Sequence, residues 1–188
     1  MFTIAAPATV LIAIRSLAAL IFLSAASAKM RHWAAFEGVV ANYRLLPRVL
    51  VAAAAYALPP VEAAIGASLL IGLFVPALAA LSQWASLAAA ALLGVFAAAM
   101  AVNLVRGRAF IDCGCFQGTL KQALRWPLVA RNAVLMLVTG ATAGSASAPA
   151  AGLEALNGLL AGGSLFMILQ SVNALLAVKI GFRRRGAV

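Results

Sequence analysis

Acidic residues, cysteines and histidines are scarce in this chain of 188 residues, and each scarcity excludes a class of function. The sequence contains four Asp and Glu residues, two cysteines and a single histidine, His32. The acidic residues are scattered, so no carboxylate pair for acid–base catalysis is present, and neither is a Walker loop, a nucleophile elbow or a dinucleotide fingerprint. A closed zinc site needs four ligands, and it is disfavoured because the chain has only two cysteines and one histidine.

Charged residues are also few, at 10% of the sequence, whereas apolar residues make up 65%. A soluble domain contains about 25% charged and about 45–50% apolar residues. A membrane-crossing helix needs about 20 apolar residues, and five segments satisfy this requirement, at about residues 4–28, 49–73, 76–105, 132–151 and 155–178. The sequence predicts an all-α, polytopic transmembrane helix bundle of four to five spans. It forms one membrane domain over residues 1–188, with a cysteine loop at residues 106–131.

The basic residues are distributed on one side of this five-span arrangement. The net charge is +10, and every Lys and Arg except Arg15 falls in the first loop, the third loop or the C-terminal tail. Positive residues mark the cytoplasmic side of a membrane protein. We therefore expect a multi-pass protein of the bacterial inner (cell) membrane with cytoplasmic basic loops and C-terminus, and no nucleic-acid partner.

Two ionisable residues, Arg15 and Glu62, interrupt the first and second spans. Arg15 precedes Lys29 by as many residues as Glu62 follows Arg48, so the two side chains are expected at one depth of antiparallel helices. The sequence predicts an Arg15–Glu62 ion pair, assisted by a carbonyl that Pro60 frees. The pair either pins two helices or lines a cavity that handles a quinone headgroup, a proton or thiol chemistry. The remaining alternative is that the two side chains never meet.

The two cysteines lie one glycine apart in Asp112-Cys113-Gly114-Cys115-Phe116. A disulfide across so short a ring is strained, and strained disulfides tend to be labile and oxidising. A redox pair is favoured. Structural cysteines and a copper(I) or zinc site are the alternatives that the spacing leaves open.

Charged neighbours bear on the reactivity of this pair. Arg106 and Arg108 supply a positive field that favours the thiolate, which is the reactive form of cysteine. Asp112 opposes that field locally and is a candidate proton shuttle. The sequence does not distinguish the attacking cysteine from the resolving one.

Several motifs together resemble the methylamine-utilisation MauE family, part of the wider MauE/DoxX group of redox-associated membrane proteins. The resemblance covers about residues 10–140 and rests on Lys29, Phe36, Tyr43-Arg44-Leu45-Leu46-Pro47, Leu58-Pro59, Glu62, Gly66 and the cysteine motif. One position departs from the family pattern, because Gln117 separates Phe116 from Gly118, whereas glycine tends to follow this phenylalanine directly in the family.

The resemblance implies a role in maturing methylamine dehydrogenase, through processing, export or disulfide formation of its small subunit. It also implies a thioredoxin-like partner of the MauD type, with Cys113 and Cys115 as the redox pair of a thiol–disulfide oxidoreductase or electron relay. A non-redox membrane scaffold or export factor for the same pathway is the alternative, and small-molecule transport is a third. No motif demands a cofactor, and a lipid quinone is a candidate.

The expected topology and the expected chemistry conflict. Disulfides form outside the cytoplasm, whereas the charge distribution places the cysteine loop inside. Either the orientation is reversed, or the loop re-enters the membrane, or the pair carries electrons from one side to the other. We favour the second and third explanations.

Overall fold

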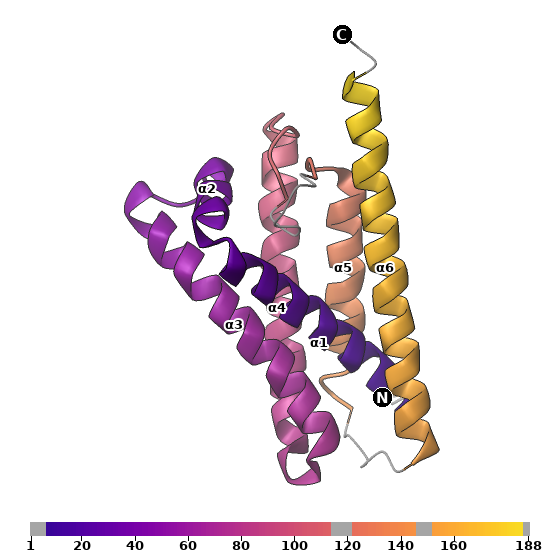
Figure 1. The fold of residues 1–188 in the computed structure, drawn as a ribbon. Coiled ribbons are helices and arrows are strands. Elements are labelled where there is room, and N and C mark those ends of the chain that lie inside the picture. The colour runs from indigo at the N-terminus through magenta and orange to yellow at the C-terminus, as the bar shows by residue number, and fades with distance from the viewer. Residues whose placement is uncertain (1–6, 114–121, 146–151, 186–188) are drawn as a thin grey trace.

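The computed structural model describes residues 7–113, 122–145 and 152–185. In these ranges the chain forms a helical bundle without strands (Figure 1). The elements are α1 (Ala8–Arg31), α2 (Trp33–Tyr43), α3 (Arg48–Phe74), the short 3-10 helix η1 (Pro76–Leu78), α4 (Ala79–Val105), α5 (Trp126–Ala141) and α6 (Leu153–Arg185). Asp112 and Ala123 pair in an isolated antiparallel bridge between α4 and α5.

Among the described residues, the helices α1, α3, α4 and α6 are long and apolar enough to cross a membrane. The fifth candidate, α5, is apolar but has only 16 residues. At 1.5 Å per residue it spans about 24 Å, less than the hydrocarbon thickness of about 30 Å. The predicted all-α, polytopic bundle of four to five spans is confirmed.

Prolines and one left-handed residue set several helix boundaries. Pro7 and Pro47 directly precede α1 and α3, and α5 carries Pro127 in its first turn. Proline suits these places because its missing N–H group would have no intrahelical partner there. Arg44 adopts φ 50° after α2, a left-handed conformation that ends the helix.

Small residues bring α1 into close contact with two neighbours. On α6, a Cβ atom added to Gly158 would lie 2.9 Å from the Thr9 carbonyl oxygen, and one added to Gly162 would lie 2.6 Å from the Ala13 carbonyl oxygen. On α3, Gly66 faces Ala19 and Leu23 in the same way. Such small-residue contacts let helix backbones approach in lipid, where packing replaces the hydrophobic drive.

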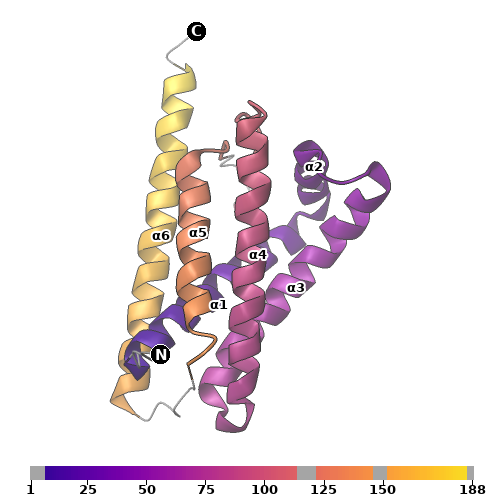
Figure 2. The same ribbon diagram turned by 180° about the vertical axis from the view of Figure 1, so that it is seen from behind.

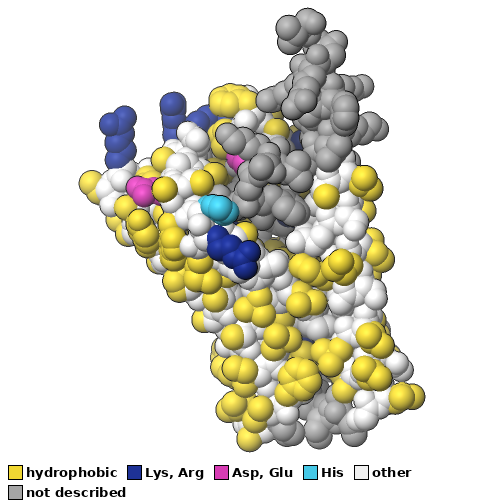
Figure 3. All heavy atoms as spheres, viewed as in Figure 1, with side chains coloured by type: hydrophobic (Ala, Val, Ile, Leu, Met, Phe, Trp, Pro, Cys, Tyr) yellow, Lys and Arg dark blue, Asp and Glu magenta, His cyan; other side chains and the backbone are white. Residues whose placement is uncertain are grey.

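The helix α1 crosses the bundle obliquely, whereas α4, α5 and α6 run in similar directions (Figures 1 and 2). The successive packing partners are α6 with α1, α1 with α3, α3 with α4, and α4 with α5. We call the end that carries α2, residues 106–113 and residues 122–125 the basic end. On the face shown in Figure 3, Lys and Arg side chains gather toward this end and the remainder is largely apolar.

The structure corrects two predicted loops. The first loop contains α2, an 11-residue helix whose Phe36 is buried and whose Trp33 ring stacks on Tyr56 of α3 at 5.0 Å. The sequence does not predict this helix, because the segment is too short to span a membrane and is flanked by basic residues. The predicted loop 106–131 and fourth span 132–151 also shift, because α5 begins at Trp126 and ends at Ala141.

Candidate functional site

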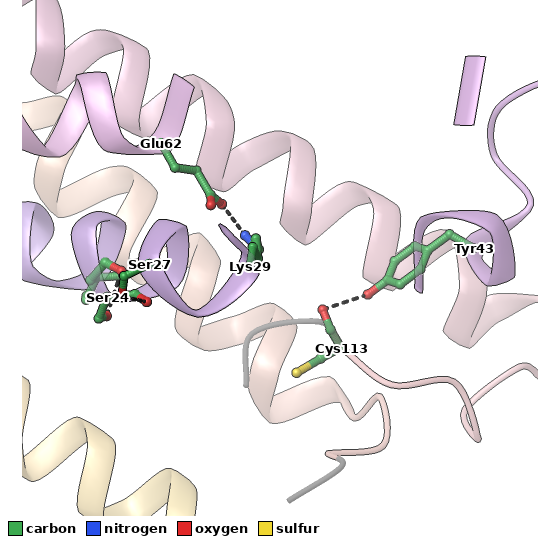
Figure 4. A network of polar contacts seen from close by, with 7 residues as sticks. Ser24, Ser27, Lys29, Tyr43, Glu62 and Cys113 are labelled. Carbon is green, nitrogen blue, oxygen red and sulfur yellow. Dashed lines mark hydrogen bonds and ion pairs between the residues drawn. The ribbon is translucent and has the colours of Figure 1, made fainter. Parts of the chain in front are cut away.

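A buried ion pair joins α1 to α3 at the basic end of the bundle. The Lys29 ammonium donates to Oε1 of Glu62, and the two residues are 5% and 1% exposed (Figure 4). Lys29 lies in the last turn of α1, where the helix dipole favours a cation. The predicted Arg15–Glu62 ion pair is therefore wrong, since the cation that meets Glu62 is Lys29.

The helix register explains this correction. Gly66 lies against Ala19 and Leu23, so Glu62, one turn earlier on α3, faces the last turns of α1. Arg15 lies about three turns from the level of Glu62. The sequence-based depth argument placed Lys29 and Arg48 at one level, whereas α2 and the chain after it carry the start of α3 beyond the end of α1.

Arg15 is fully buried at the other end of the bundle, where it contacts backbone oxygens instead of a carboxylate. Its Nη2 atom donates to the carbonyl oxygens of Thr142 at 2.7 Å and Ser145 at 3.0 Å. These carbonyls follow the last turn of α5, where backbone acceptors lack intrahelical donors and the dipole attracts a cation. Arg15 thus caps α5 from a neighbouring helix, and the carbonyl that Pro60 was predicted to supply is not one of these two acceptors.

Two phenylalanine rings flank the ammonium of Lys29. Its Nζ atom lies 5.1 Å from the ring centroid of Phe36 on α2 and 5.1 Å from that of Phe96 on α4. Aromatic faces attract a cation, and the attraction strengthens where water is excluded. The charge is therefore held by one carboxylate and two rings from three different helices.

The backbone at Cys113 is fixed by its neighbours. The Cys113 N–H donates to the Gln122 carbonyl at 2.9 Å, and the Leu124 N–H donates to the Ile111 carbonyl at 3.0 Å. These bonds join the two ends of the cysteine loop into a short antiparallel neck. Tyr43 of α2 donates from its hydroxyl to the Cys113 carbonyl at 3.3 Å (Figure 4).

The Cys113 side chain is 9% exposed and packs in a cluster with Met100, Leu124 and Leu128. Its Sγ atom lies 3.7 Å from Oε1 of Gln122, within reach of a weak S–H donor bond. The second predicted redox cysteine, Cys115, lies outside the described residues, so the pairing of the two thiols stays a prediction.

Arg108 and Asp112, two of the charged residues predicted around the cysteines, make structural contacts. Arg108 donates to the carbonyl of Asn42 at 2.7 Å and to that of Tyr43 at 3.3 Å, which ties the end of α2 to the segment after α4. Oδ1 of Asp112 accepts from the Gln122 N–H at 3.4 Å, within the neck. Arg106 is exposed. Their predicted roles, a thiolate field and a proton shuttle, remain predictions.

The ion pair and the thiol meet at one cavity of about 300 Å³ in the basic half of the bundle. Each of the described α-helices, from α1 to α6, contributes to its walls, which are largely apolar. Lys29, Glu62 and Cys113 line it together. The predicted intramembrane residue Arg15 does not line it.

A second polar group on the cavity wall was missed by the sequence analysis. Arg131 was counted as a loop cation, but it lies on α5 and donates to Oδ1 of Asn173 on α6 at 3.1 Å. Its Nε and Nη2 atoms also lie 3.3 and 3.2 Å from Oδ1 of Asn132. Arg131, Asn132, Gln170 and Asn173 all line the cavity. The signal that could have found Arg131 was Pro127, a helix-start residue four positions earlier.

The described residues contain no cluster of three or more His, Cys, Asp and Glu side chains that could hold a metal ion. The fold and the site define a polytopic helical membrane protein in which a buried ion pair and a cysteine line one cavity of a size that suits a small ligand.

Comparison with known proteins gives the family. The family model of methylamine utilisation protein MauE matches residues 7–147. Methylamine utilization protein MauE of Paracoccus denitrificans is 47% identical over 169 residues, which cover 88% of this chain and 87% of that protein. The protein of the same name from Methylorubrum extorquens is 37% identical over 172 residues, covering 90% and 89%. The chain therefore belongs to the MauE family. No solved structure matches it.

Proposed function

We propose that this protein serves methylamine utilisation as a thiol–disulfide exchange factor of the bacterial inner membrane. Its substrate chain would be the small subunit of methylamine dehydrogenase, and its exchange partner a thioredoxin-like protein of the MauD type. The observation that carries the proposal is the position of Cys113, whose backbone is fixed by Tyr43 and Gln122 while its side chain lines a cavity with two cationic residues.

Electrostatics at the cavity support a reactive thiol. Lys29 and Arg131 both line the chamber that Cys113 lines, and positive charge stabilises the thiolate. Glu62 and the two asparagine oxygens offset part of this positive charge. Three hydrogen bonds hold the backbone of the neck, two between its two chain segments and one from the Tyr43 hydroxyl. They keep the sulfur at one place on the cavity wall, as repeated exchange with a partner requires.

The exchange itself is a two-step sulfur transfer. A cysteine thiolate of the partner attacks the Cys113–Cys115 disulfide, forms a mixed disulfide and releases the other cysteine of this protein as a thiolate. The partner's second thiolate then attacks the mixed disulfide and frees the first cysteine. The net result is a partner oxidised by two electrons and a dithiol on this protein, and the reverse sequence returns the electrons.

The packing of Cys113 bears on the membrane face at which this chemistry occurs. Its cluster with Met100 and Leu128 lies between α4 and α5, inside the bundle. This burial supports a thiol that works within the membrane boundary over one in an aqueous cytoplasmic loop. We expect membrane-impermeant maleimide to label Cys113 poorly from both sides, and strong labelling from the periplasmic side alone would reverse the proposed orientation.

Replacement of the cysteines tests the redox role in cells grown on methylamine. Cys113→Ser/Cys115→Ser should accumulate in the membrane as the parent does, while the small subunit loses its disulfides and dehydrogenase activity falls to the level of a deletion strain. Each single Ser variant should trap a mixed disulfide with the thioredoxin-like partner, visible on non-reducing gels. Ser27→Ala, which removes another small polar side chain that bonds within α1, is the matched control. Normal maturation in the double variant would replace this proposal with that of a non-redox scaffold or export factor.

A further inference from the structure

We infer that the cavity at the basic end is a binding site for an isoprenoid quinone, which accepts the electrons of the Cys113–Cys115 dithiol. The inference rests on the proposed thiol exchange for its electron source. It adds the chemical class of the ligand and the direction of electron flow.

The walls of the cavity fit a ligand that dissolves in the bilayer. Its volume of about 300 Å³ is at the lower limit of sites that bind small molecules, about 300–1,000 Å³. Apolar side chains from membrane-spanning helices, such as Leu58, Leu93 and Phe166, make up most of the lining. An apolar tail would be accommodated by these walls, whereas a hydrophilic ligand would lose its hydration without compensation.

The polar groups on the wall fit a flat headgroup with hydrogen-bond acceptors. The Lys29 ammonium is held beside the rings of Phe36 and Phe96, so a planar ring entering there would meet aromatic faces and a cationic donor together. Arg131 on α5 supplies a second cationic group in the lining of the same cavity. The cavity thus offers two cationic donors, one for each carbonyl oxygen of a quinone.

The redox chemistry selects a quinone over a phospholipid chain or a peptide segment. Two S–H bonds break, one S–S bond forms, and the two electrons and two protons convert the quinone into its hydroquinone with two new O–H bonds. Lys29 and Glu62 provide a proton-exchanging pair beside the ring, where the oxygen of the reduced quinone must acquire a proton. The resulting disulfide can then oxidise the thioredoxin-like partner.

Decylubiquinone binding tests the site independently of the thiols. We would titrate it into Cys113→Ser/Cys115→Ser protein held in nanodiscs of quinone-free lipid. Ala99 lines the cavity, whereas Ala98 on the same turn of α4 is exposed. Binding should be saturable, and Ala99→Phe should weaken it by about tenfold or more while Ala98→Phe leaves it unchanged. Equal binding in the two variants, or unsaturable partitioning, overturns the site.

A second variant covers the case in which Ala99→Phe does not fold. Lys29→Met/Glu62→Gln removes both charges together, so neither is left buried alone. It should lower decylubiquinone affinity about tenfold or more, as expected for loss of a hydrogen bond from a charged donor. Unchanged affinity in this variant shows that the ammonium does not meet the headgroup and overturns the inference.

Anaerobic oxidation of the reduced wild-type protein tests the electron transfer. Decylubiquinone should convert both thiols to a disulfide, with one quinol formed for each dithiol lost. If the thiols exchange with the redoxin in cells but decylubiquinone neither binds nor oxidises them, the quinone inference fails and the proposed function stands. If decylubiquinone binds but the double cysteine variant still matures the small subunit, the site stands and the redox function fails.

Discussion

The two ends of the bundle each contain a buried cation contributed by α1, and the two cations have different environments. Arg15 is 0% exposed and donates to backbone carbonyls that follow α5. Lys29 is 5% exposed, meets a carboxylate and two aromatic rings, and lines a cavity. The Arg15 side chain is enclosed by its hydrogen-bond partners, whereas the Lys29 side chain lines the cavity.

The path of α1 through the bundle accounts for the difference. At the end near Arg15, Gly158 and Gly162 bring α6 against α1, and little space remains between them. Toward the basic end, α1 approaches α3 at Gly66 instead (Figure 1). The cavity lies at that end, and α6 contributes to its lining. The role of a buried charge in this protein is therefore set by where the helices diverge, which the residue type alone does not reveal.

Removal of one partner from the Lys29–Glu62 pair should have the largest effect on stability. Glu62→Leu leaves the ammonium buried without its carboxylate, at a cost of about 3–5 kcal/mol in the free energy of unfolding. Lys29→Met/Glu62→Leu should restore most of that loss, because neither charge remains. Thermal unfolding in detergent measures both variants. Glu62→Leu combined with Arg15→Met is the control and should show no rescue, and a rescue there would mean that Arg15 is the true partner.

Loss of the Arg15 guanidinium should be the next most harmful change. Arg15→Met leaves the Thr142 and Ser145 carbonyls without this donor, and we expect a loss of about 1.5–3 kcal/mol, typical of a hydrogen bond to a charged group. Abundance in the membrane and thermal unfolding report the loss. Decylubiquinone affinity of the folded fraction should stay unchanged, because Arg15 is remote from the cavity. If Arg15→Met lowered decylubiquinone affinity as much as Lys29→Met/Glu62→Gln does, the two ends of the bundle would not differ in function.

A pair of adjacent glycines on α6 tests the close packing near Arg15. A Cβ atom on Gly162 would overlap Ser16 and Ala13 of α1, whereas one on Gly163 meets nothing within 4 Å. Gly162→Ala should therefore cost about 1–3 kcal/mol through overpacking, and Gly163→Ala should gain up to about 1 kcal/mol from helix propensity. Equal melting temperatures in the two variants would show that α6 does not contact α1 as described.

Much of the fold could be predicted from the sequence because long apolar segments in lipid have few alternatives to helix. The spans at 49–73 and 76–105 correspond closely to α3 (Arg48–Phe74) and to η1 with α4 (Ala79–Val105). The short helix α2 was missed because its length gives no membrane signal. The start of α5 was missed because Arg131 was read as marking a loop, although its guanidinium is bonded inside the bundle.

The sequence singles out Glu62 and Cys113, because an intramembrane carboxylate is rare and costly and the cysteine pair is the only one in the chain. It does not show that the two residues line the same cavity, as they do in the structure. The partner of Glu62 depended on helix register, which Gly66 sets through a contact that no periodicity records. The cavity itself depends on the angle between α1 and its neighbours, and that angle follows from the sum of many packing contacts.

The two tyrosines of the chain offer the mildest test, confined to the basic end. Tyr43→Phe removes the hydroxyl that donates to the Cys113 carbonyl and should cost about 0.5–1.5 kcal/mol. Its main effect should be on reactivity, because a loosened neck exposes the sulfur and speeds its alkylation by maleimide in a Cys115→Ser background. Tyr56→Phe, which keeps the ring stacked on Trp33, is the matched control and should alkylate at the parental rate. If Tyr43→Phe also alkylates at the parental rate, the neck is held without the hydroxyl, and the position of Cys113 is set by the Gln122 and Leu124 backbone bonds alone.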